Sequence, residues 1–299
     1  MIKILIIGRH GFTSRNLFEY FTNCDEYDVK LVGSVELDLL NENIVKSYFS
    51  ANYYDVVIDT AIYNPRVGTG KEPEKELEYD LRMFHNLAKC HDRYGKLIYF
   101  GSGAEYDKSF PICSVSEDEL DNLIPKNVYG MAKYIIGQEI EAGIYNSDNI
   151  YNLRIFGLYG KYENWKTTFI SGACCKAIFD MPITIRQNVY FDYLYIDDFC
   201  KMLDAFIRLE NPRYHTYNIT SGKRVSLIEI AQIVKAVSGK ELDIIIKKDG
   251  LANEYTSNNE RLLKEIGGFD FEPMSKSVEK LYSYYEQIKD EIDKNLLSV

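Results

Sequence analysis

Short apolar runs alternate with amphipathic stretches of helical length through about the first hundred residues. Strands are predicted at Ile4–Ile7, Lys30–Ser34, Val56–Thr60 and Lys96–Phe100, and helices at 14–22, 41–51 and 74–92. This alternation is typical of an α/β fold, in which a parallel sheet is covered by helices on both faces. The polar loop 64–74 after the third strand is predicted to be a lid, because ligands in such sheets bind outside the carboxyl ends of the strands.

The regular alternation of strands and helices ends at about residue 156. The order predicted there is helix, hairpin, two helices, strand and helix, at 167–179, 183–195, 197–208, 226–238, 242–247 and from 275 onward. We interpret the chain as a Rossmann-type, doubly wound parallel sheet with a smaller, interleaved α/β substrate domain. The dinucleotide-binding domain takes 1–155 with about 188–222, and the substrate domain takes 156–187 with 223–299.

Composition and charge exclude several classes of protein. The chain has 299 residues, of which 46% are hydrophobic and 27% charged, as is ordinary for a globular protein. Its formal net charge of −10 argues against nucleic-acid binding, which needs a basic surface. Six cysteines without a C-x-x-C pair and four histidines without zinc-ligand spacing predict no metal site. No apolar run approaches the roughly 20 residues that cross a bilayer, so we expect a cytoplasmic protein without membrane contact.

The first strand enters a glycine turn that opens a helix. Gly8 permits the tight turn, and Gly11 lets the backbone approach a pyrophosphate, which would sit on the N–H groups of the helix N-terminus. Ser14 takes the position of the usual third glycine, so a slightly wider spacing of helix and strand is expected. We interpret this segment as a dinucleotide-binding turn.

Charge indicates which dinucleotide binds. An NAD site usually places an acid at the end of the second strand, where the acid accepts hydrogen bonds from the ribose 2′-hydroxyl. That strand ends here at the uncharged Ser34, and Arg9 within the glycine turn could pair with a 2′-phosphate. The sequence therefore favours NADP(H), with NAD(H) as the alternative.

Three residues form the predicted catalytic group. Tyr129 and Lys133 begin a predicted helix, and their spacing puts both side chains on one face. A phenol is a poor base at neutral pH, but an ammonium held beside it stabilises the phenolate and makes proton transfer feasible. Ser102 ends a predicted strand, and its hydroxyl could hydrogen-bond the same substrate oxygen.

The chain thereby resembles the extended short-chain dehydrogenases/reductases, in the branch of nucleotide-sugar epimerases, reductases and dehydratases. The resemblance covers nearly the whole chain and extends to Leu153–Gly160, Tyr193–Asp198, Tyr217–Gly222 and Gly268–Pro273, while Glu36–Leu40 is most similar to GDP-fucose synthases. It implies an NAD(P)-dependent enzyme with a nucleotide-sugar substrate. It also implies a homodimer formed through the helix of Tyr129 and its neighbour near 80–92.

The resemblance assigns further residues to the cofactor. Thr60 and Ala61 would line the nicotinamide ribose, and Lys133 would also hold the ribose hydroxyls. Phe12 and Phe156 would complete the cofactor site.

On the substrate side, Ser102 and Gly103 would lie against the sugar. The arginine with which the family often binds diphosphate is replaced by Phe191 in this chain. Arg186 and Arg224 are the candidates to take its place, with Arg213 as a third; the alternative for each is an ordinary surface residue.

Departures from the family pattern narrow the chemistry. Gly103 and Ala104 stand where the 4,6-dehydratases carry an Asp-Glu pair, so no acid is placed to eliminate water. Ala104 also replaces the cysteine with which GDP-fucose synthases invert ring carbons, and no histidine lies between residues 92 and 214.

What remains is hydride transfer, by a reductase of a nucleotide-linked keto sugar or by a nucleotide-sugar C4 epimerase with tightly bound cofactor. A non-catalytic dinucleotide-sensing regulator is the alternative from another class. The presence of Ser102, Tyr129 and Lys133 together favours an enzyme.

Overall fold

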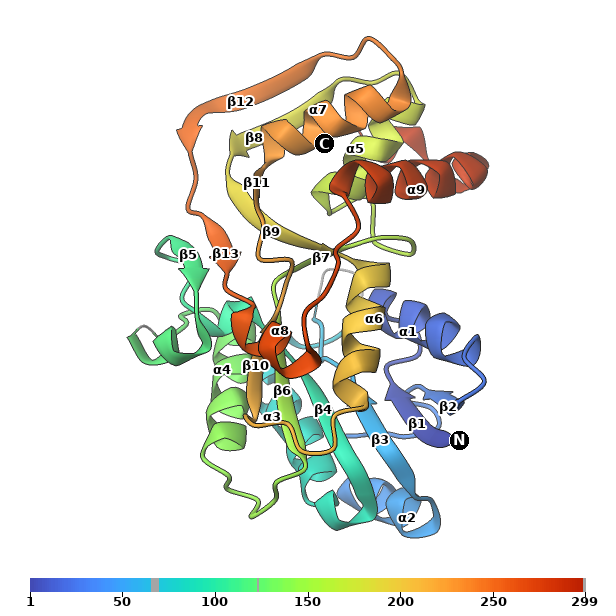
Figure 1. Ribbon diagram of the computed structural model, residues 1–299, viewed down its shortest axis with the longest axis vertical. Coiled ribbons are helices and arrows are strands. Elements are labelled where there is room, and N and C mark those ends of the chain that lie inside the picture. Colours follow the sequence, from blue (N-terminus) through green and yellow to red (C-terminus); the bar gives the residue numbers. More distant parts are fainter. Residues whose placement is uncertain (66–69, 123, 298–299) are drawn as a thin grey trace. The chain divides into compact units, whose positions relative to one another are not determined.

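The computed structural model describes residues 1–65, 70–122 and 124–297, and the chain divides into two compact units (Figure 1). The first unit comprises 1–108, 116–155 and 204–219, and the second comprises 109–115, 156–203 and 220–299. Residues 66–69 of the loop predicted at 64–74 lie outside the described part of the chain, so the lid stays a prediction.

The first unit contains a six-stranded parallel sheet. Its strand order is β10-β6-β4-β3-β1-β2. The bounds are Ile2–Ile7 for β1, Tyr27–Val32 for β2, Tyr54–Asp59 for β3, Tyr94–Ser102 for β4, Ile150–Ile155 for β6 and Thr216–Ile219 for β10. The order runs outward in both directions from β1 and β3, as in a doubly wound fold, and confirms the predicted fold class.

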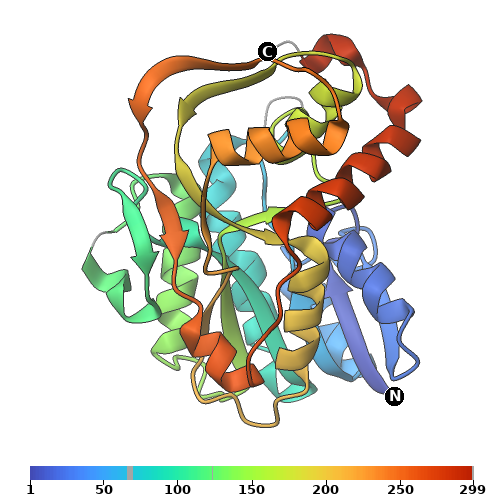
Figure 2. The ribbon, with the colours of Figure 1, turned by 45° about the horizontal axis from the view of Figure 1, so that its top comes forward.

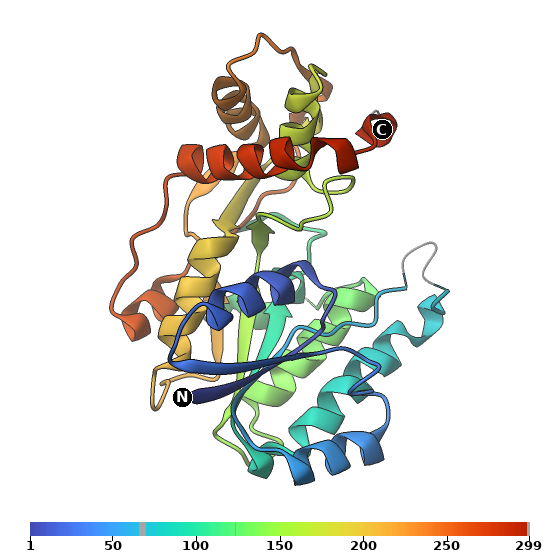
Figure 3. The ribbon, with the colours of Figure 1, turned by 90° about the vertical axis from the view of Figure 1, so that its right-hand side faces the viewer.

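Helices cover both faces of this sheet (Figure 3). The helices are α1 (Phe12–Thr22), α2 (Glu42–Ala51), α3 (Glu76–Ala88) and α4 (Val128–Glu141). Leu5 and Ile7 of β1 belong to the core formed with α2, α3 and α4, whereas the alternate residues Ile4 and Ile6, equally buried, face the opposite side. From Ile4 to Ile7 the strand is therefore apolar at every position, because both of its faces are covered there.

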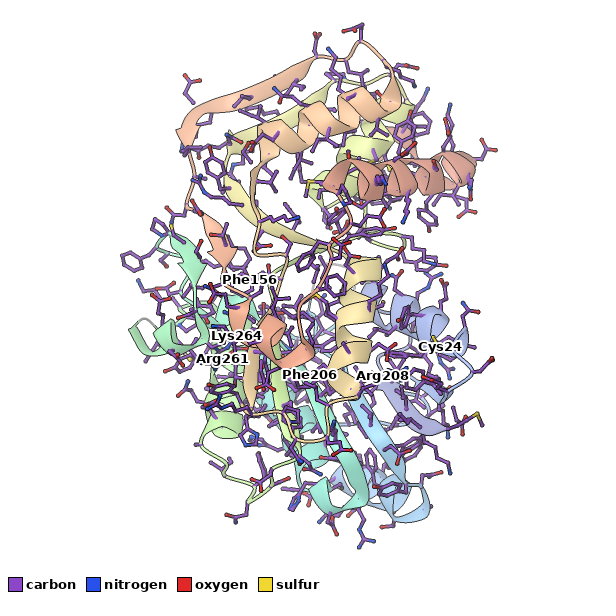
Figure 4. The ribbon with its side chains drawn as sticks, in the orientation of Figure 1. Cys24, Phe156, Phe206, Arg208, Arg261 and Lys264 are labelled. Carbon is purple, nitrogen blue, oxygen red and sulfur yellow. The ribbon has the colours of Figure 1, made fainter. Side chains whose placement is uncertain are left out.

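Aromatic side chains pack together at the edge of the sheet formed by β6 and β10. Helix α6 (Ile196–Ile207) begins in the second unit and ends in the first, where the ring of Phe206 lies edge-on to Tyr151 of β6 and Tyr217 of β10, at 5.5 and 5.3 Å between centroids (Figure 4). Arg208, just beyond the helix, pairs with Asp204 and Glu26. These contacts fasten the end of α6 to the sheet of the first unit.

The second unit is built from short strands and three larger helices. Its strands are β5 (Ile112–Val115), β7 (Gly157–Tyr159), β8 (Ile183–Asn188), β9 (Tyr190–Tyr195), β11 (Arg224–Ser226), β12 (Ile244–Leu251) and β13 (Tyr255–Ser257). Its helices are α5 (Phe169–Ile178), α7 (Leu227–Ser238), α8 (Glu260–Ile266) and α9 (Met274–Gln287). Helices α5, α7 and α9 pack on one another, as Figure 2 shows from above.

The hairpin predicted at 183–195 is wrong. Both strands exist, but β8 pairs in parallel with β12, while β9 pairs with β7, β11 and β13. Only Val189 separates β8 from β9, and one residue cannot reverse the chain into the two-residue turn that a tight hairpin needs. The chain therefore bends at Val189 and continues into a different sheet.

The division of the chain differs from the predicted domains in its middle part. The predicted boundary after residue 155 agrees with the end of a segment of the first unit, but 188–203 belong to the second unit. The reason is the pairing of β9 with β11 and β13, which are strands of the second unit. Residues 109–115 join that unit too, because β5 pairs with β13.

Candidate active site

The turn between β1 and α1 requires glycine at position 8. Gly8 has φ of +119°, and a Cβ atom there would lie 2.3 Å from Thr60 Oγ1. The Thr60 hydroxyl donates to the carbonyl of Ile7 at 2.8 Å, which ties the end of β3 to the end of β1. The structure therefore brings the predicted residues Gly8, Thr60 and Ala61 together at the carboxyl edge of the sheet.

The N-terminus of α1 offers backbone donors. Gly11 precedes the helix in extended conformation, with φ of −73° and ψ of 151°, and no side chain of the described residues caps the first turn, which begins with Phe12. The Ser14 hydroxyl lies 2.5 Å from the Gly8 carbonyl oxygen and 3.0 Å from that of Gly11, so serine at the third position is bonded to the turn. This cradle fits a dinucleotide pyrophosphate, whose charge the free N–H groups would meet.

Arg9 is paired with an acid. Its guanidinium contacts the carboxylate of Glu36 and donates to the carbonyl of Leu31 at 2.9 Å, while Glu36 also accepts from the Gly33 N–H at 3.0 Å. The bond from Gly33, and then the charge of Arg9, lower the pKa of Glu36. Glu36 thus lies two residues after the exposed Ser34 and was not predicted as the partner of Arg9. Its only signal in the sequence is a carboxylate shortly after the second strand.

Ser102 ends β4 and caps the 3-10 turn Gly103–Glu105. Its hydroxyl oxygen accepts from the N–H of Ala104 at 3.0 Å, and Glu105 accepts from the N–H of Ser102 at 3.1 Å. Ser102 is 8% exposed, and Gly103 and Ala104 are buried. Because the Ser102 hydroxyl oxygen is used here as an acceptor, its hydrogen stays available to a substrate oxygen.

Helix α4 presents Tyr129 and Lys133. Asn127 caps the helix by accepting from the N–H of Gly130 at 2.7 Å. Lys133, buried at 3% exposure, donates to the carbonyl of Phe100 at 2.7 Å, and its Nζ lies 5.8 Å from the centroid of the Tyr129 ring. Since Phe100 is two residues from Ser102 on β4, the structure brings the predicted residues Ser102, Tyr129 and Lys133 together.

Two buried carboxylates lie within the electrostatic reach of Lys133. Asp59 ends β3 and accepts from the N–H of Ala61 at 3.0 Å; Asp80 of α3 accepts from the N–H of Tyr63 at 2.6 Å. Burial raises the pKa of each to about 6, against the attraction of Lys133. Asp80 Oδ2 is buried without a hydrogen-bond partner among the described residues. The sequence analysis missed both, although an acid at the end of an apolar strand was a signal for Asp59.

The remaining predicted residues belong to the second unit. The ring of Phe156 lies 5.0 Å from that of Tyr255 (Figure 4). Arg224 of β11 is engaged by Glu254, with 2.8 Å between Nη2 and the carboxylate, and its guanidinium lies 3.3 Å from the centroid of the Tyr190 ring. Arg186 is exposed, as Arg224 is, and lines a cavity.

That cavity, of about 570 Å³, is basic. Trp165, Lys166, Lys176, Arg186 and Lys247 line it, and none of the described residues around it is acidic. Burial and the neighbouring Lys247 lower the pKa of Lys176. Within an acidic protein, this local excess of cations suits an anionic ligand.

Among the residues that the structure describes, no group of His, Cys, Asp and Glu side chains could hold a metal ion. No helix in the described part of the chain combines the length and apolar character of a membrane span.

Fold and site together define a dinucleotide-binding enzyme. Residues 4–220 match the model of the NAD dependent epimerase/dehydratase family, and the chain belongs to that family. It is an NAD(P)-dependent enzyme of the oxidoreductase/epimerase type.

Individual relatives are distant. A probable GDP-L-fucose synthase of Oryza sativa subsp. japonica is 20% identical over 308 residues, with 95% of this chain and 92% of that protein covered. The GDP-mannoheptose C4 reductase MlghC of Campylobacter jejuni, solved with NADP bound, superposes with a TM-score of 0.82 at 18% identity, over 95% of this chain and 98% of that one. UDP-glucose 4-epimerase of Thermotoga maritima, solved with UDP-glucose, gives 0.81 at 16% identity, over 96% and 100%. At these identities the two structures show the shared fold alone.

Replacing the buried acid at the end of β3 should stabilise the protein above pH 6. The pKa of Asp59 rises from 3.8 to about 6 on folding, so the folded chain keeps a proton that the unfolded chain has released. This contribution to stability is complete below pH 4 and is lost as the pH rises through 6. Asp59→Asn has no such loss and should gain roughly 3 kcal/mol at pH 8 and little at pH 4.

Urea unfolding of both proteins at the two pH values measures this gain. Asp55→Asn, a half-buried carboxylate of the same strand that accepts from the N–H of Lys3, is the control. A gain of equal size at pH 8 and pH 4 would contradict the raised pKa of Asp59.

Proposed function

We propose that the protein is an NADP(H)-dependent reductase of a nucleotide-linked keto sugar. The observation that carries the proposal is the hydrogen bond from Lys133 to Phe100, which joins the helix of Tyr129 to the strand that ends at Ser102. A proton donor, a hydroxyl donor and a buried ammonium are thereby held at the carboxyl edge of the sheet.

Each residue has a separate task. Tyr129 gives its proton to the oxygen of the substrate carbonyl, and Ser102 donates a hydrogen bond to the same oxygen. Lys133 stabilises the phenolate that remains and holds the ribose hydroxyls of the cofactor. A nicotinamide cofactor held here would supply the hydride. Gly103 and Ala104 offer no acid or thiol to this centre, which limits the chemistry to hydride transfer at one carbon.

The first unit would hold the cofactor. The Gly8–Gly11 turn and Phe12 receive the pyrophosphate, Thr60 and Ala61 line the ribose, and Ser34 and Arg9 lie at the adenosine end. A 2′-phosphate would take the place of the Glu36 carboxylate on Arg9, an exchange that the exposure of both side chains, 42% and 37%, permits. The NADP found in the related reductase supports this choice of cofactor.

The basic cavity of the second unit would take the diphosphate of the nucleotide. Lysine ammonium groups and the Arg186 guanidinium are suited to phosphate oxygens, and Trp165 offers a ring for the nucleobase. Arg224, which the sequence analysis also selected, is already neutralised by Glu254 and is the weaker candidate.

A nucleotide-sugar C4 epimerase is the second candidate. It would use the same Ser102, Tyr129 and Lys133, and the related epimerase of Thermotoga maritima has the same fold. A cofactor-sensing regulator would not need this complete set. As the family resemblance implies, we also propose a homodimer formed through α3 and α4.

Tyr129→Phe should lower kcat about 100-fold and leave NADPH affinity within a factor of two to three, because only the proton donor is lost. Turnover is followed by the absorbance of NADPH and affinity by fluorescence titration. Tyr134→Phe, on the same helix, is the matched control and should keep its kcat. Near-normal turnover of the Tyr129 variant would refute this mechanism.

Arg9→Ala should weaken NADPH binding by roughly 1 to 3 kcal/mol and leave NADH binding almost unchanged, because the 2′-phosphate loses its charged partner. Isothermal titration with both cofactors gives the ratio of affinities. Arg15→Ala removes the same charge from the surface of α1 and should keep that ratio. Equal losses for both cofactors would show that Arg9 only supports the turn.

Purified protein should convert a keto-sugar nucleotide only with stoichiometric consumption of added NADPH. A reductase releases its oxidised cofactor in every turnover, whereas an epimerase keeps its cofactor through the cycle. Absorbance of reduced nicotinamide and chromatography of the sugar nucleotides measure the ratio. Interconversion of two sugar nucleotides without added cofactor, at constant absorbance, would favour the epimerase instead.

A further inference from the structure

A fully buried carboxylate lies directly behind the Ser102 turn. Glu105 is 0% exposed, and its Oε1 accepts from the N–H of Ser102 at 3.1 Å. Its Oε2 accepts from Nε of Arg154 at 2.6 Å, and the amide of Asn152 lies 3.2 Å from both oxygens. We call Glu105, Asn152 and Arg154 the Glu105 cluster; it joins the end of β4 to β6.

Two glycines leave room for this carboxylate. A Cβ atom on Gly101 of β4 would lie 2.3 Å from Glu105 Oε1, and one on Gly137 of α4 would lie 2.6 Å from Oε2. Both distances are shorter than any real carbon–oxygen contact of this kind. The backbone of α4 therefore rests directly on the carboxylate, one helical turn beyond Lys133.

We infer that Glu105 is a positioning residue of the catalytic centre. One of its oxygens fixes the backbone of Ser102, and the other lies against the helix that carries Tyr129 and Lys133. The carboxylate thus sets the distance between the hydroxyl of Ser102 and the phenol of Tyr129. This inference rests on the proposed function, in which those two groups bind one carbonyl oxygen.

The competing explanation is that Glu105 only neutralises Arg154. Arg154 is 2% exposed, and it also donates to the Tyr106 hydroxyl at 3.2 Å and to the carbonyl of Glu117 at 3.3 Å. Neutralisation alone gives no reason for the bond to Ser102 or for the close approach of Gly137. Two kinds of variant distinguish the explanations: one that removes the buried charges together, and one that displaces α4 while Glu105 stays in place.

The double variant Glu105→Leu/Arg154→Met makes this separation. It removes both buried charges and keeps similar volume, a change that often leaves stability equal or higher. Leucine cannot accept from Ser102. We expect a melting temperature within about 5 °C of the wild type or above it. We also expect kcat to fall roughly 10- to 100-fold. The dissociation constant of NADPH should stay within about threefold, because β1 and α1 are untouched.

Amide hydrogen exchange of the peptide 99–106 provides a readout that needs no substrate. The Ser102 amide should exchange at least tenfold faster in the double variant, while α1 keeps its protection. Asp204→Leu/Arg208→Met removes another carboxylate–guanidinium pair of the first unit, at 2.8 Å, and should change neither kcat nor this exchange.

Gly137→Ala tests the helix side with Glu105 in place. Its methyl group must push α4, and Lys133 with it, away from the carboxylate, so kcat should fall roughly tenfold or more. NADPH affinity should fall less than kcat, because the Gly8 turn and Thr60 are untouched. Gln138→Ala places the same residue one position along α4 and should be neutral.

The outcomes are distinct. If the double variant keeps both the stability and the kcat of the wild type, or if hydrogen exchange of its Ser102 amide is unchanged, Glu105 only neutralises the charge of Arg154 and the inference is wrong. If the wild type reduces no keto-sugar nucleotide, the proposed function fails and the inference fails with it.

Discussion

The proposed catalytic centre depends on a buried ammonium. An amine as deep as Lys133 must be hydrogen-bonded or paired with charge, because desolvation without compensation is too costly. The carbonyl of Phe100 accepts one of its hydrogens, and this bond fixes α4 against β4. Asp59 and Asp80 supply charge of the opposite sign, and Lys133 in turn restrains the rise of their pKa values. Helix, strand end and buried acids are thus parts of one electrostatic arrangement.

The anion binding proposed for this acidic protein depends on where its charges lie. The chain carries a formal net charge of −10, which repels phosphate at long range, yet one cavity of the second unit has only basic and neutral residues along its described walls. At the end of β2, Arg9 and Glu36 cancel each other. An exposed ion pair of this kind contributes little stability, so a cofactor phosphate can replace the carboxylate at small cost.

Short-range patterns made much of this structure predictable from sequence. The apolar strands of the sheet, the Gly8 turn, and the pair Tyr129 and Lys133 are set by local geometry, and the structure places them as expected. The pairing of Glu36 with Arg9 was not predicted, because Glu36 lies in a loop two residues beyond Ser34, the position where an NAD site usually has its acid. The β8–β9 hairpin failed because hydrophobic alternation indicates strands without indicating their partners. The middle segment 188–203 was assigned to the other domain for the same reason.

Buried acids are harder to predict, because tertiary packing decides whether a carboxylate is covered. Glu105 looks in the sequence like a polar turn residue, and only the absence of side chains at Gly101 and Gly137 creates the space in which it lies. Asp80 lies on an amphipathic helix among charged neighbours. That its carboxylate is buried and accepts from the N–H of Tyr63 is seen only in the structure.

The two enzymatic candidates share their catalytic groups and differ in how they hold the cofactor. In both proposals Ser102, Tyr129 and Lys133 move one proton and support hydride transfer, so these residues alone do not separate a reductase from an epimerase. The separation must come from retention of the dinucleotide. At the adenosine end this chain offers an exposed ion pair that opens and closes easily, and such a contact favours exchange of the cofactor over permanent capture. The reductase is therefore the preferred of the two proposals.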